Sequence, residues 1–321
     1  MLKKKEIWIK GSIVLLFVTF FGFYVKGFML YHEQHGNHPL VFGATYMTMN
    51  NQFYDVLNTE IRHVVEKRGD HLITLDPALD QDKQNAQIEY LIAQDADVIF
   101  LNPVDWKGVE PGLLMAKEAG IPVIVVDTPV YRPELVSVTI VSDNYQAGVL
   151  CAQDMMKKRK KADIVLLTHE EAKSALDRIA GFLDTIGGRK EYRIIAAKDS
   201  QGQIERALPK MKKILEEHPA PDVIMALNDP AAMGALAALD QKKCRESVLV
   251  YGVDGSPEAK KLIQDHMMTG SAVQFPKKMG KKAVQTAYAL LEGKKVEKEI
   301  LMPVELVTEE TIEQFEIDRW Q

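Results

Sequence analysis

From residue 40 onward, short apolar runs alternate with stretches of helical periodicity, and residues 222–235 (DVIMALNDPAAMGA) are the clearest example. Residues 223–227 form an apolar run typical of a strand that is buried on both faces of a parallel sheet. Asp229 suits a helix N-cap and Pro230 a first helical position, so a helix is predicted to follow at once. Strands that lead directly into helices predict an α/β protein with parallel sheets.

The same alternation continues along the rest of the chain. Strands are predicted over 40–46, 71–75, 97–101, 121–126, 136–141, 163–167, 192–197, 223–227, 248–253 and 270–274, and helices over 52–67, 84–94, 109–119, 144–158, 173–186, 203–218, 231–239, 257–265 and 277–291. These strands are too many for one comfortable sheet, so we predict two similar α/β lobes with right-handed crossovers. The change of lobe is placed near Ser142, where the rhythm begins again.

The first 30 residues form a separate segment. Four lysines within the first ten residues precede an uncharged stretch over 11–25. With its flanking lysines extended to the membrane surface, the apolar segment over 7–30 approaches the ~20 residues that a bilayer requires. The positive charge on the N-terminal side predicts that the rest of the chain is exported. Because no small-x-small cleavage site follows, an uncleaved signal anchor over 1–30, with a linker over 31–39, is favoured over a cleaved signal peptide.

Composition and motifs exclude several classes of function. A net charge of -5 over 321 residues gives no basic surface for nucleic acid. Cys151 and Cys244 are predicted to be free thiols outside any metal-ligand spacing, and no cofactor is expected. His32, His35 and His38 could in principle bind a metal, but three histidines in a polar linker are more often linker residues. Glycine-rich phosphate loops and the common catalytic motifs are missing. An acid/base pair of Asp127 and Asp254 is the one enzymatic alternative.

Polar side chains stand at the carboxyl ends of the predicted strands. Each is by itself an ordinary cap or turn former, but open α/β sheets bind ligands at these ends, so the set is expected to converge on one crevice. The set comprises Asn102, Asp127, Asn228, Asp254 and Gln274, with Asn51, Phe53 and Tyr54 after the first strand. Carboxylates and amides pair with vicinal hydroxyls, and an aromatic face covers the C–H surface of a sugar ring. The crevice therefore favours a hydroxyl-rich ligand.

Eight segments, taken in order, resemble the type I periplasmic sugar-binding proteins, particularly the ribose-, galactose- and xylose-binding group. They are MNNQFY (49–54), FLNPVD (100–105), VVD (125–127), SDNYQAG (142–148), DRIAGF (177–182), ALNDPAAMGA (226–235), YGVDGSPEA (251–259) and AVQFPKKMG (272–280). The resemblance covers residues 40 to about 308. It implies two lobes joined by a three-crossing hinge, one lobe made of 40–142 plus 275–304 and the other of 143–274 plus 305–321.

The resemblance also implies a ligand set. In that family an aromatic pair sandwiches the sugar ring and polar groups bind its hydroxyls, and the matching residues here are Asn51, Phe53, Tyr54, Asn102, Asp127, Arg178, Asn228, Asp254 and Gln274. Arg178 is the member that the strand ends do not indicate, since alone it is an ordinary helix charge. Three departures from the ribose-binding pattern, at Met47, at Thr128 and over 200–203, leave a pentose, a hexose or another polyhydroxylated signal as expected ligands.

Two functions follow from these expectations. The protein is predicted to capture a monosaccharide outside the cytoplasm and deliver it to the permease of an ABC importer. The alternative is a sensor that presents its closed form to a membrane histidine kinase or chemoreceptor, which the anchor favours because its helix can pair with helices of such a partner. A sugar-responsive repressor is excluded, since an apolar span stands where a DNA-binding domain would be.

Overall fold

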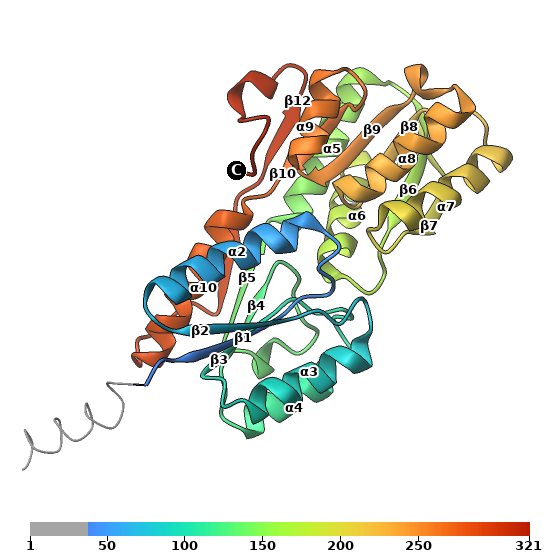
Figure 1. Ribbon diagram of the computed structural model, residues 1–321. Coiled ribbons are helices and arrows are strands. Elements are labelled where there is room, and N and C mark those ends of the chain that lie inside the picture. The colour runs from blue at the N-terminus through green and yellow to red at the C-terminus, as the bar shows by residue number, and fades with distance from the viewer. Residues whose placement is uncertain (1–37) are drawn as a thin grey trace, which may run out of the picture. The chain divides into compact units, whose positions relative to one another are not determined.

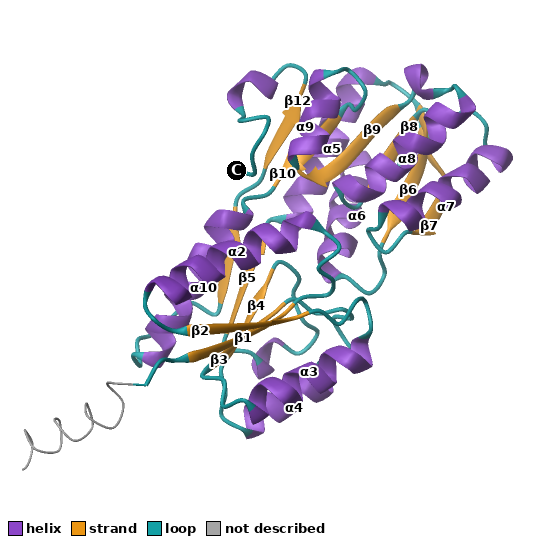
Figure 2. Cartoon of the chain, in the orientation of Figure 1, coloured by secondary structure: helices purple, strands orange, loops and turns teal. Residues whose placement is uncertain are grey.

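The computed structural model describes residues 38–321, and residues 41–321 form one compact unit. This unit consists of two α/β lobes, each built on a six-stranded sheet (Figures 1 and 2). Among residues 38–321, no helix combines the length and the apolar character needed to cross a bilayer. The signal anchor predicted over 1–30 lies outside the described residues.

The first sheet is parallel throughout, with strand order β11-β5-β4-β3-β1-β2. Its strands are β1 (Val41–Thr45), β2 (His71–Leu75), β3 (Val98–Leu101), β4 (Val123–Val126), β5 (Val138–Ser142) and β11 (Glu299–Met302). Strands β3 and β4 are buried at every position, as the apolar runs predict for a parallel sheet covered on both faces.

The second sheet has strand order β12-β10-β9-β8-β6-β7, and β12 is its one antiparallel strand. Its strands are β6 (Ala162–Thr168), β7 (Tyr192–Asp199), β8 (Val223–Ala226), β9 (Leu249–Asp254), β10 (Gly270–Val273) and β12 (Glu305–Thr308). The chain passes between the sheets after β5, after β10 and between β11 and β12. Strands β11 and β12 were not predicted, because each is a four-residue edge strand that begins with an exposed glutamate.

Helices cover both sheets (Figure 2). Those packed on the first sheet are α2 (Gln52–Lys67), α3 (Gln81–Ala93), α4 (Glu110–Glu118) and α10 (Pro276–Leu291), and those on the second are α5 (Asn144–Lys158), α6 (Lys173–Ile186), α7 (Ile204–Glu217), α8 (Asp229–Lys242) and α9 (Pro257–Gln264). The pairs in closest contact are α2 with α10, α3 with α4, α5 with α6 and α7 with α8. Helices α2, α5 and α6 have the bounds that their periodicity predicts.

Each lobe has its own apolar core. Ile99, Leu101, Val123 and Val125 belong to the core of the first lobe, and Ile164, Leu166, Val223 and Met225 to that of the second. Both cysteines are free, as predicted, with Cys151 in the core of the second lobe. With the two cores formed independently, the polar strand ends between them are left to contact each other or a ligand.

Candidate ligand-binding site

A small cavity lies between the two lobes, and eight of the nine predicted ligand residues line it. The eight are Asn51, Phe53, Tyr54, Asp127, Arg178, Asn228, Asp254 and Gln274. Asn102 is not among the lining residues: it is fully buried behind Asp127, and its side-chain amide donates to Asp127 Oδ2 over 3.1 Å and to the carbonyl of Val126 over 3.2 Å. In this arrangement Asn102 orients a carboxylate that itself faces the cavity.

The start of α2 supplies one wall. Asn51 caps the helix through its side-chain oxygen, which accepts a hydrogen bond of 2.9 Å from the backbone N–H of Phe53. This cap fixes the first turn and places the rings of Phe53 and Tyr54 against the cavity, edge to face with centroids 5.5 Å apart. The cap uses the carbonyl oxygen of Asn51, so its amide NH₂ is the group that remains to donate to a ligand.

Two carboxylates face the cavity, one from a strand end of each lobe. Asp127 directly follows β4, and Asp254 ends β9. Both residues have positive φ angles, 68° for Asp127 and 137° for Asp254. Backbone conformations of this kind cost free energy in residues other than glycine and are concentrated at functional sites. Strained backbone at these two positions is typical of a functional site.

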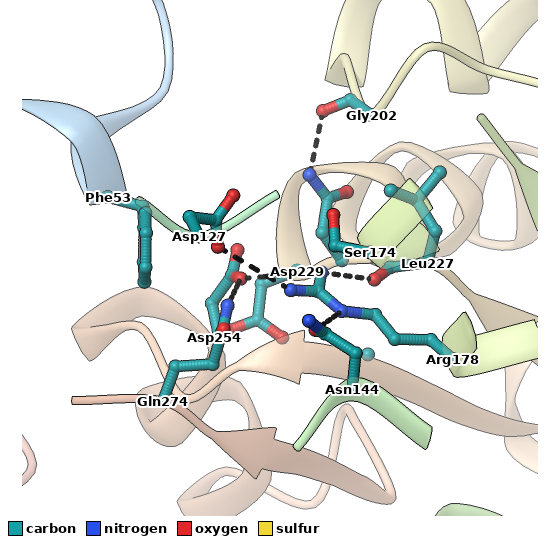
Figure 3. Close-up of polar contacts among 12 residues, drawn as sticks. Phe53, Asp127, Asn144, Ser174, Arg178, Gly202, Leu227, Asp229, Asp254 and Gln274 are labelled. Carbon is teal, nitrogen blue, oxygen red and sulfur yellow. Dashed lines mark hydrogen bonds and ion pairs between the residues drawn. The ribbon is translucent and has the colours of Figure 1, made fainter. Parts of the chain in front are cut away.

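Arg178 lies between the two carboxylates (Figure 3). Its guanidinium is 3.9 Å from Asp127 Oδ1 and 3.9 Å from Asp254 Oδ1. Two hydrogen bonds hold the guanidinium in place. Its Nε donates to Asn144 Oδ1 over 2.7 Å, and its Nη1 donates to the carbonyl of Leu227 over 2.9 Å. A single cation from the second lobe therefore neutralises carboxylates of both lobes.

The position of Arg178 depends on how closely α5 and α6 approach each other. A methyl group on Gly148 of α5 would collide with the carbonyl of Arg178, and one on Gly181 of α6 would collide with the carbonyl of Tyr145. Only glycine at these two positions permits the helices to touch backbone to backbone. The glycines of SDNYQAG and DRIAGF thus bring Arg178 and its partner Asn144 together.

Burial dominates the electrostatics of the cavity. It raises the pKa of Asp127, against the opposing effect of Arg178, and it raises the pKa of Asp254 further, with the neighbouring charge of Asp229 adding to the effect. Burial also raises the pKa of Asp229 to about 6. The guanidinium of Arg178 opposes this rise in pKa for both Asp127 and Asp254 and so favours their ionised forms.

Among the described residues, several acceptor oxygens in the cavity have no hydrogen-bond donor. Asp127 Oδ1, Asp254 Oδ2, Gln274 Oε1 and Gln201 Oε1 are buried without a hydrogen bond, and all four residues line the cavity. The other oxygen of Asp254 accepts a bond of 2.9 Å from the amide of Gln274. Unpaired buried acceptors cost about 1–3 kcal/mol each, so a ligand that offers hydrogen-bond donors would stabilise this site.

The lobes contact each other around the cavity. Thr128 Oγ1 is 2.8 Å from Ser174 Oγ, and the backbone N–H of Trp106 donates to the carbonyl of Glu171 over 3.0 Å. The cavity volume is about 20 Å³, which holds about one water molecule. The two lobes are therefore in a closed arrangement, and a sugar can enter only if they, or the lining side chains, move apart.

Sequence reasoning placed the helix cap of α8 on the wrong residue. Asn228, not Asp229, is the N-cap, and its side-chain oxygen accepts a bond of 3.0 Å from Ala231 N–H while its amide donates to Gly202. Asp229 instead accepts bonds from the backbone N–H of Ser256 and, over 2.6 Å, from Ser271 Oγ. The cap assignment failed because these partners come from later elements, the N-cap of α9 and β10, which local sequence does not reveal.

Other lining residues were missed altogether. They are Met47, His169, Ala172, Ser174, Gln201, Gly202, Gln203 and Leu227. Met47 and 200–203 had been noted as departures from the ribose-binding pattern, and that was the available signal. Their side chains provide an apolar patch and extra amides where the ribose-binding pattern has a serine and an aromatic ring.

Two α/β lobes that close over a cavity lined by carboxylates, amides and aromatic rings define a two-lobed binding protein. The sequence profile of the periplasmic binding protein domain matches residues 42–295. The chain therefore belongs to the periplasmic binding protein family, in its type I sugar-binding group. Like its relatives, it is a solute-binding protein rather than an enzyme.

Named relatives agree with this assignment. The ribose import binding protein RbsB of Escherichia coli K12 is 30% identical over 265 residues, which is 82% of this chain and 88% of the relative. The protein of the same name from Bacillus subtilis 168 is 30% identical, over 83% and 87% of the two chains. A crystal structure of an ABC transporter solute binding protein from Agrobacterium vitis with bound D-fucose superimposes with a TM-score of 0.82 at 26% identity, covering 88% of this chain and 100% of that chain.

Proposed function

We propose that this protein binds a neutral, polyhydroxylated ligand, a pentose or hexose, in the cavity between its lobes outside the cytoplasm. The observation that carries the proposal is the set of four unpaired buried acceptor oxygens, on Asp127, Asp254, Gln274 and Gln201. Hydroxyl groups are the donors that suit such a set, because each can donate to one acceptor while accepting from a neighbouring donor. A cation would suit it less, because Arg178 already compensates both carboxylates.

We propose the nine residues of the ligand set with distinct roles. Phe53 and Tyr54 cover the C–H face of the sugar, while Asp127, Asp254, Arg178 and Gln274 bind hydroxyls. Asn51 and Asn228 serve as helix caps and each retain donor capacity toward the cavity. Asn102 does not contact the ligand itself; its amide donates to Asp127 and so orients that carboxylate.

The test is a titration of the full chain, in mild detergent, with a panel of pentoses and hexoses by isothermal calorimetry. Asp254→Ala and Asn228→Ala are each expected to weaken binding of the tightest sugar about tenfold or more, at 1.4 kcal/mol per decade. Glu89→Ala, an exposed carboxylate of α3, is the matched control and should leave affinity unchanged. Unchanged affinity in both cavity variants would show that the ligand binds elsewhere.

We propose lobe boundaries of 40–142 plus 275–304 and 143–274 plus 305–321. Strand pairing supports them, since β11 joins the first sheet and β12 the second. Three chain crossings then form the hinge about which the lobes open. A ligand shifts an open–closed equilibrium only through its different affinities for the two states, and the unpaired acceptors of the closed form supply that difference.

We infer that the closed, ligand-bound form is delivered to an ABC importer, which the names of the relatives support. The second candidate is a sugar sensor that signals to a membrane histidine kinase or chemoreceptor, and the apolar segment over 7–30 favours it as an uncleaved single-pass anchor. Neighbouring genes separate the two: a permease and an ATPase support import, whereas a sensor kinase and a response regulator support signalling. A reporter fused after Leu30 should be active outside the cell, and activity only in the cytoplasm would contradict export.

A further inference from the structure

The C-terminal segment after β12 is attached to the second lobe by a buried lysine. Lys260 of α9 is fully buried, and its ammonium donates to the carbonyl of Glu316 over 2.5 Å and to the carbonyl of Arg319. Burying an ammonium group is costly unless its donors are satisfied. The two hydrogen bonds compensate for this cost and hold the backbone of the C-terminal segment on α9.

The same segment reaches the first lobe. The indole of Trp320 packs edge to face on Phe53, with ring centroids 5.8 Å apart and planes at 72°, and the carbonyl of Trp320 accepts a bond of 3.2 Å from Lys277 Nζ. Phe53 begins α2 and Lys277 begins α10, the two helices that pack together on the first sheet. In Figure 1 the red chain end returns from beyond β12 toward the start of α10.

We propose that residues 316–320 form a strap between the lobes, and that Trp320 is a positioning residue for Phe53. Trp320 is largely buried and contacts Phe53 without lining the cavity itself, so it can act on a ligand in the cavity through the Phe53 ring. The strap therefore acts in two ways. It stabilises the closed arrangement, and it fixes the ring against which a ligand packs.

A fixed Phe53 ring contributes more to ligand affinity in this cavity than it would in a cavity with two facing aromatic walls. The two benzene-type rings that line it, Phe53 and Tyr54, both come from α2. The opposite lobe contributes the imidazole of His169 and, at apolar positions, Ala172, Gly202 and Leu227. Loss of one aromatic contact of the kind that Trp320 makes is expected to weaken ligand binding about three- to tenfold. The inference rests on the proposed function for that affinity effect, but not for the effect on lobe closure.

The experiment measures lobe closure first, without any sugar. Spin labels are placed on Lys117→Cys and Glu217→Cys, exposed positions of α4 and α7, in a full chain that also carries Cys244→Ser, and the distance between them is measured by pulsed electron resonance. We expect Trp320→Ala to enlarge the longer-distance, open population relative to the parent protein. Trp320→Phe should largely restore the parent distribution, whereas Tyr90→Ala, which changes an exposed aromatic residue of α3, is the control and should leave the distribution unchanged.

The second measurement is calorimetric titration with the tightest pentose or hexose, where the three- to tenfold loss of affinity is expected for Trp320→Ala and not for Tyr90→Ala. If no sugar binds the parent protein, the proposed function fails while the distance measurement still tests the strap. An unchanged distance distribution in Trp320→Ala overturns the strap, whatever the ligand. Should that variant not fold, Trp320→Leu, which keeps apolar bulk but loses the ring contact, takes its place with the same criterion.

Discussion

Replacing Arg178 by methionine tests the electrostatic centre of the site. The substitution preserves much of the apolar stem and removes the guanidinium that lies 3.9 Å from each of two buried carboxylates. It also leaves the side-chain oxygen of Asn144 and the carbonyl of Leu227 without their donor. The variant therefore retains two like charges in a nearly dry cavity with nothing to offset them.

The expected cost follows from these distances. At an effective dielectric constant of about 20, each 3.9 Å contact corresponds to about 4 kcal/mol of attraction. Proton uptake by the carboxyl groups limits the loss, so we expect the free energy of unfolding to fall by about 3–5 kcal/mol at pH 7, as when one partner of a buried pair is removed. Arg178→Lys, which keeps a charge but not the forked geometry, should lose less.

The pH dependence distinguishes this explanation from a simple packing defect. Arg178 opposes the burial that raises the pKa values of Asp127 and Asp254, so its removal raises both further. The folded variant then binds more protons than the folded parent. The difference between their free energies of unfolding therefore shrinks as the pH falls toward the pKa of about 4 of an unfolded carboxyl group. Urea denaturation of both proteins at pH 7.5 and pH 5 measures this difference. A difference that is equal at the two pH values, or below about 1 kcal/mol, would refute the reasoning.

Two further predictions concern ligand binding. Hydroxyls that donate to the unpaired oxygen of Asp254 favour its ionised form, so ligand binding should lower the raised pKa of Asp254 and release protons. Calorimetry should therefore give a weaker affinity at pH 5 than at pH 7.5. Tighter binding at pH 5 would contradict this prediction. Thr128→Val removes the hydroxyl that meets Ser174 across the lobes, and should reduce affinity about three- to tenfold, whereas Thr128→Ser should retain it. Equal affinities for Thr128→Val and Thr128→Ser would show that this contact does not contribute to closure.

Much of the fold could be predicted because its signals are local. A buried parallel strand is a short apolar run, and the polar residue that ends it stands next to that run in sequence, so Asp127, Asn228 and Asp254 could be found without any knowledge of pairing. Their meeting in one cavity follows from a rule of parallel sheets, which gather their carboxyl ends at one edge. Phe53 and Tyr54 closely follow the first strand, and that position sufficed to place them beside the same edge.

What local patterns could not reveal depends on contacts between distant segments. The bond from Arg178 to Asn144 requires that α5 and α6 touch, and glycine spacing alone does not say which helices meet. Asp229 looked like a cap because its partners Ser256 and Ser271 lie on later elements. Asn102 follows a strand as the ligand residues do, and only the neighbouring strand shows that its amide binds Asp127 instead of facing the cavity.

Several features of the closed cavity each cost free energy in the folded protein. Asp127 and Asp254 have strained backbone angles and raised pKa values, and each has an unpaired oxygen. None of these features stabilises the fold, and at about 1–3 kcal/mol for each unpaired acceptor they favour lobes that separate and admit water. A ligand that donates hydrogen bonds removes this penalty only when both lobes contact it, since Asp127 and Asp254 belong to different sheets. Lobe closure and ligand recognition are then one equilibrium, because the residues that select the ligand are also those that make the empty closed state costly.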